Sequence, residues 1–116
     1  MADALALHQA GRVNEAEAAY RRLLADGPAD TQARDDTLHL LGLLLHQTGR
    51  PAEAEPLLRQ VLAAEPGFFE AWNSLGAVLL ALGRRAEAAD AWRTALRLNP
   101  GHDKAAANLD RLGPSP

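Results

Sequence analysis

The chain of 116 residues has the length of a single domain, and its composition favours helices, because alanine and leucine are abundant while aromatic residues make up only 4%. A net charge of −3 argues against a nucleic-acid surface, which normally needs a basic face. The sequence has no cysteine for disulfides or thiolate zinc sites and no apolar run long enough to span a membrane. We therefore expect a cytoplasmic protein that binds neither nucleic acid nor membrane.

The spacing of apolar residues predicts pairs of short amphipathic helices separated by glycine turns. The first helix is short, from Ala2 to about Gln9. Asp30 is a predicted N-cap, so the second pair begins near Thr31 with a helix one turn longer than usual. Pro56 falls inside the second helix of this pair, where we expect it to be tolerated.

The remaining sequence predicts a third helix pair and one last helix. An apolar stripe over 69–82 predicts a helix that Gly83 ends, and the helix after it stops at Asn99-Pro100-Gly101. A last helix is predicted over 103–112, with Ala106 and Leu109 facing the preceding pair. A short tail follows over 113–116.

The landmarks of these helix pairs recur along the chain. In the third pair they are Trp72, Leu75, Gly76, Leu79, Gly83, Ala88, Trp92, Ala95 and Pro100. The counterparts 34 residues earlier are Leu38, Leu41, Gly42, Leu45, Gly49, Ala54, Leu58, Val61 and Pro66, and those a further 38 residues earlier are Ala4, Leu7, Gly11, Ala16, Tyr20, Leu23 and Pro28. A single pair cannot bury its stripes alone, so stacked pairs predict an all-α solenoid with these landmarks in its core. We expect the glycines inside helices, Gly42 and Gly76, to face the small residues Ala54 and Ala88.

This pattern resembles the tetratricopeptide repeat, a unit of about 34 residues with the signature W-x2-L-G-x2-Y, A-x3-F and P. The third pair matches from Trp72 to Gly76 and again at Ala88, Trp92 and Pro100. The resemblance implies a right-handed superhelical α-solenoid of antiparallel helix pairs. It divides a single domain over 1–112 into a truncated repeat at about 1–30, repeats at about 31–68 and 69–102, and a capping helix at about 103–112.

In this family the first helix of each pair lines a concave groove that takes peptides or helices of other proteins. Carried over to this sequence, the groove residues are Leu5, His8, Gln9, Asp36, His39, Leu43, His46, Gln47, Glu70, Asn73, Ala77, Leu80, Ala81 and Lys104. An equally weighted alternative is that they are simply exposed helix residues. Members that clamp a C-terminal carboxylate use Lys, Arg and Asn in the groove, whereas these places hold mainly His, Gln, Leu and Ala. With Asp36 and Glu70 in the groove, an amphipathic or mildly basic peptide suits it best.

The sequence contains no recognisable catalytic or cofactor motif. Its two serines, Ser74 and Ser115, lack a recognisable base and orienting group. His39 and His46 lie about 10 Å apart along one helix, too far to share a zinc ion. His8 and His46 are equivalent in adjacent units and could approach each other, but a third ligand is missing. We therefore expect no metal, no cofactor and no enzymatic activity.

The leading interpretation is a non-catalytic protein–protein interaction module that binds a peptide or helix of a partner in the concave groove. Two alternatives remain open. The uncapped apolar N-terminal end could make the chain a self-assembling homo-oligomer. The chain could also be the N-terminal regulatory or substrate-recruiting part of a larger multidomain enzyme.

Overall fold

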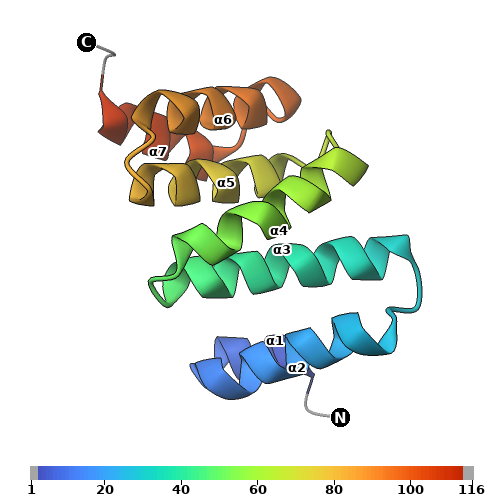
Figure 1. The fold of residues 1–116 in the computed structure, drawn as a ribbon. Helices are drawn as coiled ribbons and strands as arrows, with labels where there is room; N and C mark the ends of the chain where they lie inside the picture. Colours follow the sequence, from blue (N-terminus) through green and yellow to red (C-terminus); the bar gives the residue numbers. More distant parts are fainter. Residues whose placement is uncertain (1–2, 114–116) are drawn as a thin grey trace.

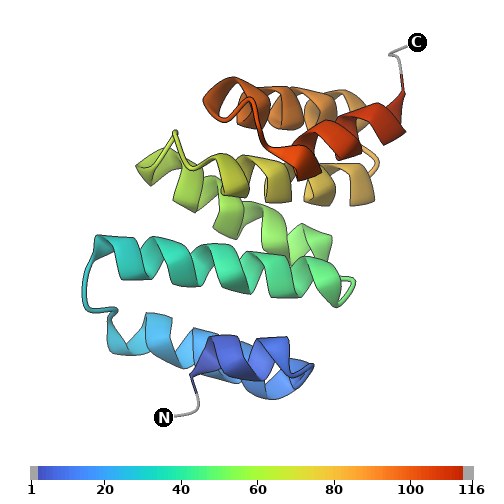
Figure 2. The same cartoon turned by 180° about the vertical axis from the view of Figure 1, so that it is seen from behind.

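The computed structural model describes residues 3–113 and, within them, contains seven α-helices and no strand. The helices are α1 (Ala4–Gln9), α2 (Val13–Asp26), α3 (Thr31–Gln47), α4 (Pro51–Ala64), α5 (Phe69–Ala81), α6 (Arg85–Leu98) and α7 (Asp103–Leu112). They stack as antiparallel pairs along one axis, which confirms the predicted all-α solenoid (Figures 1 and 2). The predicted helix start at Ala2 and the tail beyond Gly113 lie outside the described residues.

The phrase that occurs twice in the sequence, LHQAGR at 7–12 and LHQTGR at 45–50, forms the turn inside a helix pair. Gly11, Gly49 and Gly83 adopt φ values of 79°, 78° and 80°, a region that side-chain-bearing residues rarely enter. The arginine after each glycine donates its backbone N–H to the carbonyl of the leucine five residues earlier, at 2.8–2.9 Å. This is the Schellman bond that ends a helix at a left-handed glycine.

The long first helix of the second pair is confirmed. α3 has 17 residues and α5 has 13, a difference of 17 − 13 = 4 residues or about one turn. Asp30 caps α3, because its side chain accepts a hydrogen bond of 2.7 Å from the backbone N–H of Ala33. α4 continues through Pro56 from Pro51 to Ala64, so this proline is tolerated as predicted.

The core follows most of the apolar landmarks of the repeat, but not all of the predicted set. Leu7 is only partly buried, and landmarks in the turns, such as Gly49, Pro66 and Pro100, are exposed. Leu58, Val61, Ala88 and Trp92 are all at least 98% buried, and Tyr20 in the truncated first pair is equally covered. Trp72 is only partly buried, and its indole Nε1–H donates a hydrogen bond of 2.8 Å to the carbonyl of Pro66. Leu23 is 40% exposed, because six-residue α1 is too short to cover the second half of α2.

The glycines inside helices make room for large side chains. The expected alanine neighbour is found in part at Gly42, where a Cβ would lie 3.6 Å from the carbonyl oxygen of Ala54, but at Gly76 the nearest atoms belong to Trp92 and not to Ala88. A Cβ on Gly76 would lie 2.7 Å from Cδ1 of Trp92, and one on Gly42 would lie 3.1 Å from Cδ2 of Leu58. The ring of Trp92 therefore lies directly against the backbone of α5, where its Nε1–H donates to the carbonyl of Asn73 at 3.1 Å. The absent side chain makes room for this indole, which offsets the cost of a helical glycine.

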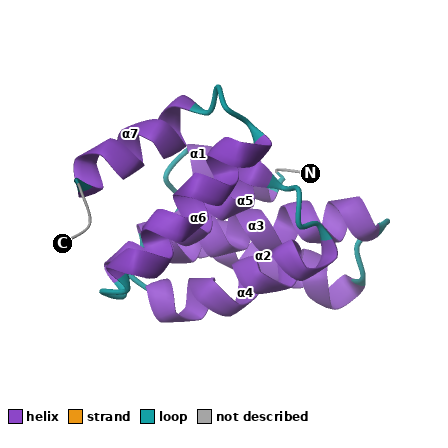
Figure 3. Cartoon of the chain, turned by 90° about the horizontal axis from the view of Figure 1, so that it is seen from above, coloured by secondary structure: helices purple, strands orange, loops and turns teal. Residues whose placement is uncertain are grey.

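α7 covers the end of the stack, where it contacts α6 and α5 and lies to one side of the preceding pair when viewed along the stack (Figure 3). Its buried residues are Ala105 and Leu112, while Leu109 is partly buried against the core. Ala106, which was expected to face the preceding pair, is only partly buried. The neighbouring Ala105 is fully buried in its place.

Candidate functional site

The first helices of the pairs lie beside one another on one side of the solenoid. α3 contacts α5 and α5 contacts α7, so these helices form one continuous wall. Three hollows follow that wall, between α1 and α3, between α3, α5 and the start of α7, and between α5 and the end of α7. We call this side of the molecule the first-helix face.

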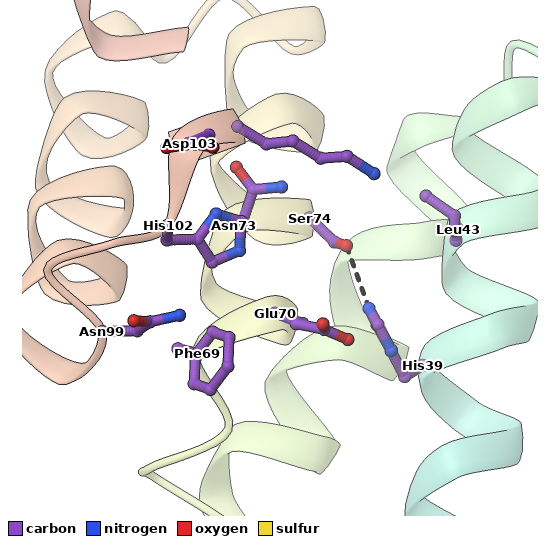
Figure 4. A pocket seen from close by; sticks show the side chains of 10 residues that line it. His39, Leu43, Phe69, Glu70, Asn73, Ser74, Asn99, His102 and Asp103 are labelled. Carbon is purple, nitrogen blue, oxygen red and sulfur yellow. Dashed lines mark hydrogen bonds between the residues drawn. The ribbon is translucent and has the colours of Figure 1, made fainter. Parts of the chain in front are cut away.

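The central hollow has a volume of about 440 Å³ (Figure 4). It is lined by the predicted groove residues His39, Leu43, Glu70, Asn73 and Lys104, together with Phe69, Ser74, Asn99, His102 and Asp103. His39 is 8% exposed, so its ring forms the floor of the hollow and is not a freely exposed groove residue. Burial lowers its pKa, which the nearby carboxylates of Glu70 and Asp36 partly offset.

Ser74 and His39 form a pair that the sequence did not reveal. The Oγ of Ser74 lies 3.0 Å from Nε2 of His39, and both side chains are 8% exposed. A serine hydrogen-bonded to a histidine corresponds to two of the three residues of a nucleophilic catalytic triad. The third residue of such a triad is a carboxylate that orients the imidazole through its other nitrogen. Within residues 3–113 the hydrogen bonds of His39 include no carboxylate. This hydrogen bond joins α3 to α5 across the floor of the hollow.

The hollow between α1 and α3 has a volume of about 340 Å³ and is lined by Leu5, His8, Gln9, Leu40, Leu43 and Gln47. His8 is fixed by two hydrogen bonds, of 2.9 Å between Nδ1 and the Tyr20 hydroxyl and of 2.6 Å between Nε2 and Oε1 of Gln47. Because the amide oxygen only accepts, Nε2 carries the proton and Tyr20 donates to Nδ1. His8, which belongs to α1, thus links α2 to α3.

The third hollow has a volume of about 420 Å³ and includes the predicted groove residues His46, Ala77, Leu80 and Ala81. Leu80 is 42% exposed, so an apolar surface opens to solvent here. His46 is equivalent to His8, yet its Nδ1 is buried without a hydrogen-bond partner. The second pair has Leu58 at the position equivalent to Tyr20, and a leucine cannot donate the hydrogen bond that the Tyr20 hydroxyl gives to Nδ1 of His8.

Thirteen of the 14 predicted groove residues line these three hollows, and Asp36 lies outside them. Asp36 is exposed and accepts a hydrogen bond of 2.9 Å from Nε2 of Gln32. Sequence reasoning missed Phe69, the first residue of α5, and Asn99 and His102, which cap the end of α6 and the start of α7. The side chain of His102 caps α7 by accepting from the N–H of Ala105 at 3.2 Å, and histidine is not a typical capping residue.

The opposite side of the molecule carries an ionic network that repeats between pairs. Arg50 bonds Glu53 of its own pair at 2.7 Å and Glu17 of the preceding pair at 2.6 Å. Arg84 bonds Glu87 and Glu55 in the same way, at 2.7 Å and 2.8 Å. The arginines hold the pKa values of Glu17, Glu53 and Glu87 below their ordinary range. Within residues 3–113, every carboxylate in an ion pair lies in this way on α2, α4 or α6.

Residues 3–113 contain no group of three or more His, Cys, Asp or Glu side chains that could hold a metal ion. None of the helices in that range has both the length and the apolar character needed to cross a bilayer.

The comparison with protein families decides the relationship suggested by the repeat. The profile of the tetratricopeptide repeat matches residues 39–103, more than half of the chain. The chain belongs to the tetratricopeptide repeat family. The family match begins within α3, covers α4, α5 and α6, and ends at the first residue of α7. No curated protein sequence matches the chain.

Solved tetratricopeptide repeat structures share the whole fold. MamA of strain AMB-1 is 31% identical, with a TM-score of 0.76, and the alignment covers 94% of this chain and 57% of that chain. The O-GlcNAc transferase of Thermobaculum terrenum is 32% identical, with a TM-score of 0.86 and coverage of 96% and 21%. The second TPR domain of human RPAP3, solved with the HSP70 peptide SGPTIEEVD, is 20% identical, with a TM-score of 0.84 and coverage of 97% and 90%. The chain spans about three fifths of the MamA chains that it matches.

Proposed function

We propose that this tetratricopeptide repeat protein is a non-catalytic interaction module that binds a peptide or helix of a partner protein along the first-helix face. The observation that carries the proposal is the row of three hollows from α1 to α7. The row includes two leucines, Leu5 and Leu80, that are 41% and 42% exposed. Exposed apolar side chains with convergent polar groups in a hollow are typical of binding grooves.

The chemistry of the face favours an amphipathic peptide with basic residues. Leu43 and Leu80 offer apolar contacts along the wall, and Glu70 and Asp36 offer negative charge. An acidic peptide such as the one bound to RPAP3 suits this face less well, because like charges across an interface are unfavourable. A partner helix would place its apolar stripe on the leucines and its basic residues over the carboxylates.

Binding of a peptide selected from a displayed library tests whether the first-helix face is the binding site. Peptides chosen from a displayed library against the purified chain are labelled, and their dissociation constants are measured by fluorescence anisotropy. The double variant Leu43→Ser and Leu80→Ser should abolish binding while the circular dichroism spectrum stays helical. Leu98→Ser is the control, because Leu98 is 45% exposed on α6 and its replacement removes an exposed leucine, comparable to Leu80, from outside the first-helix face. Equal weakening by Leu98→Ser, or full binding by the double variant, would move the site away from the first-helix face.

Self-association through the N-terminal pair is the second candidate, and one observation favours it. Leu23 is 40% exposed, although the equivalent Val61 and Ala95 of the other pairs are completely buried. A second copy that covers this leucine would bury apolar surface that the short α1 leaves open. Light scattering over a range of concentrations should then show a dimer that Leu23→Ser converts to a monomer. A monomer at every concentration would exclude this candidate.

A third candidate is a recruiting or regulatory segment of a larger enzyme. The likeness to the Thermobaculum terrenum transferase supports it, because the alignment with this chain covers only 21% of that enzyme. An antibody raised against the chain should then detect, in cells that make it, a protein much larger than 12.4 kDa. A single band at the mass of the chain alone would contradict this candidate.

A further inference from the structure

Four carboxylates gather around the turn from α4 to α5 without a cationic partner. Asp35 and Asp36 belong to α3, Glu65 is the C-cap residue of α4, and Glu70 lies in the first turn of α5. None of the ion pairs among residues 3–113 includes any of these four groups. The arginines that neutralise carboxylates elsewhere lie on the opposite side of the molecule, so this end of the first-helix face is left negative.

Two of these four carboxyl groups, those of Asp35 and Glu65, each have a buried oxygen to which no group donates a hydrogen bond. Asp35 is 3% exposed, and its Oδ2 is buried without a hydrogen-bond partner. Oε2 of Glu65 is buried and unpartnered in the same way. The Asp35 carboxyl beside it raises the pKa of Glu65, and burial adds to the effect. Because an unpaired buried carboxylate is costly, this site is incomplete without a proton or a cation.

The Asp35–Glu65 pair opens onto a hollow of about 420 Å³ through Glu65. The hollow is lined by Gln32, Glu65, Gly67, Phe68, Phe69 and Glu70. Phe69 and Glu70 also line the central hollow (Figure 4), so the two hollows are neighbours that share these two residues. Aromatic rings and carboxylates together attract an organic cation, through the ring faces and through charge-assisted hydrogen bonds.

A divalent metal fits the same site poorly. Ca²⁺ takes about six to eight oxygen ligands, and residues 3–113 offer no group of three or more metal-ligating side chains. A guanidinium or ammonium group needs fewer acceptors and tolerates aromatic walls. We propose that this hollow binds an arginine or lysine side chain of a peptide on the first-helix face, with Glu65 as its acceptor and the buried carboxyl of Asp35 behind it. The inference rests on the proposed function, because the cation belongs to the bound partner.

Binding of a cation here competes with the proton that the pair holds. The titratable and charged groups around Glu65 are Asp35, Asp36 and His39 on α3 and Glu70 on α5, and the adjoining central hollow adds His102, Asp103 and Lys104 at the start of α7. A cation stabilises the ionised form of Glu65, so affinity should rise with pH through the raised pKa of this carboxyl. His39 acts in the same direction, since the buried imidazole loses its charge as the pH rises and ceases to repel a cation.

A small probe tests the site without any partner protein. Nα-acetyl-arginine amide is titrated into the ¹⁵N-labelled chain at pH 7, and the amide shifts of Gly67 and Phe68 are followed by NMR. We expect saturable shifts with the arginine probe and none with its neutral citrulline analogue. Glu65→Gln should weaken binding about tenfold, the loss of one charge-assisted hydrogen bond. Glu70→Gln should weaken it less, because its exposed carboxylate is solvated.

Asp110→Asn is the matched control, because it removes one negative charge from an exposed position on α7 and should leave the affinity unchanged. Dispersed amide spectra of the variants show that each is folded. Equal shifts with the citrulline analogue, or unchanged affinity in Glu65→Gln, would overturn the proposal. Displacement of the probe by CaCl₂ well beyond the effect of equal ionic strength of NaCl would identify a metal site instead. A failure here would leave peptide binding through Leu43 and Leu80 intact, so it differs from a failure of the proposed function.

Discussion

Replacing histidine by leucine at equivalent positions of two repeats should change stability in opposite directions. His8, His46 and Leu80 occupy the same place in the three pairs. His8 has both ring nitrogens hydrogen-bonded, whereas Nδ1 of His46 is buried without a partner. The third pair already has leucine at this place, so the fold accepts the apolar side chain.

The magnitudes follow from the hydrogen bonds. His8→Leu leaves the hydroxyl of Tyr20, a residue 2% exposed, without its acceptor, which costs about 1–2 kcal/mol. His46→Leu removes a buried nitrogen that has no partner, and we expect a gain of about 1 kcal/mol. In a domain of this size that gain corresponds to a rise of about 4 °C in Tm.

Urea unfolding at pH 7.5, followed by tryptophan fluorescence, measures both variants. Adding Tyr20→Phe to His8→Leu is the internal control, because it removes the stranded hydroxyl and should recover much of the lost stability. Destabilisation of similar size by both leucine variants would refute the reasoning. It would show that the environment of His46 satisfies its imidazole as well as that of His8.

Trp92→Ala should lower the free energy of unfolding by about 3–5 kcal/mol in urea titrations, because it empties a large core position; a change near zero would show that the helix register is wrong. Gly76→Ala should lower Tm more than Gly42→Ala, because the new methyl meets the rigid ring of Trp92 while Gly42 faces a leucine that can rotate; the reverse order would contradict this packing. The raised pKa of Glu65 contributes stability that is complete below about pH 4.3 and is lost as the pH rises through the folded value. Unfolding measured across this range should show that Glu65→Gln abolishes that loss, and an unchanged pH profile would exclude the shared proton.

The landmark residues determine most of the fold without any coordinates. Their spacing places apolar side chains on one stripe per helix, and the glycine after each first helix ends it in the left-handed conformation. Stacking is the only way to bury such stripes, so the solenoid and the long α3 could be predicted. The groove positions followed from the resemblance to the family, and 13 of the 14 lie in hollows of the first-helix face.

Properties that depend on two distant side chains were decided only by the tertiary structure. The pairing of His39 with Ser74 spans 35 residues, and that of Asp35 with Glu65 brings α3 to the end of α4. A linear pattern reports whether a residue faces inward, but not which polar atom it meets there. Gly76 illustrates the same limit, because its neighbour proved to be Trp92 and not the expected Ala88. The repeat thus determined the scaffold, while packing between non-equivalent side chains, which differ from one pair to the next, decided where the first-helix face is polar, apolar or charged.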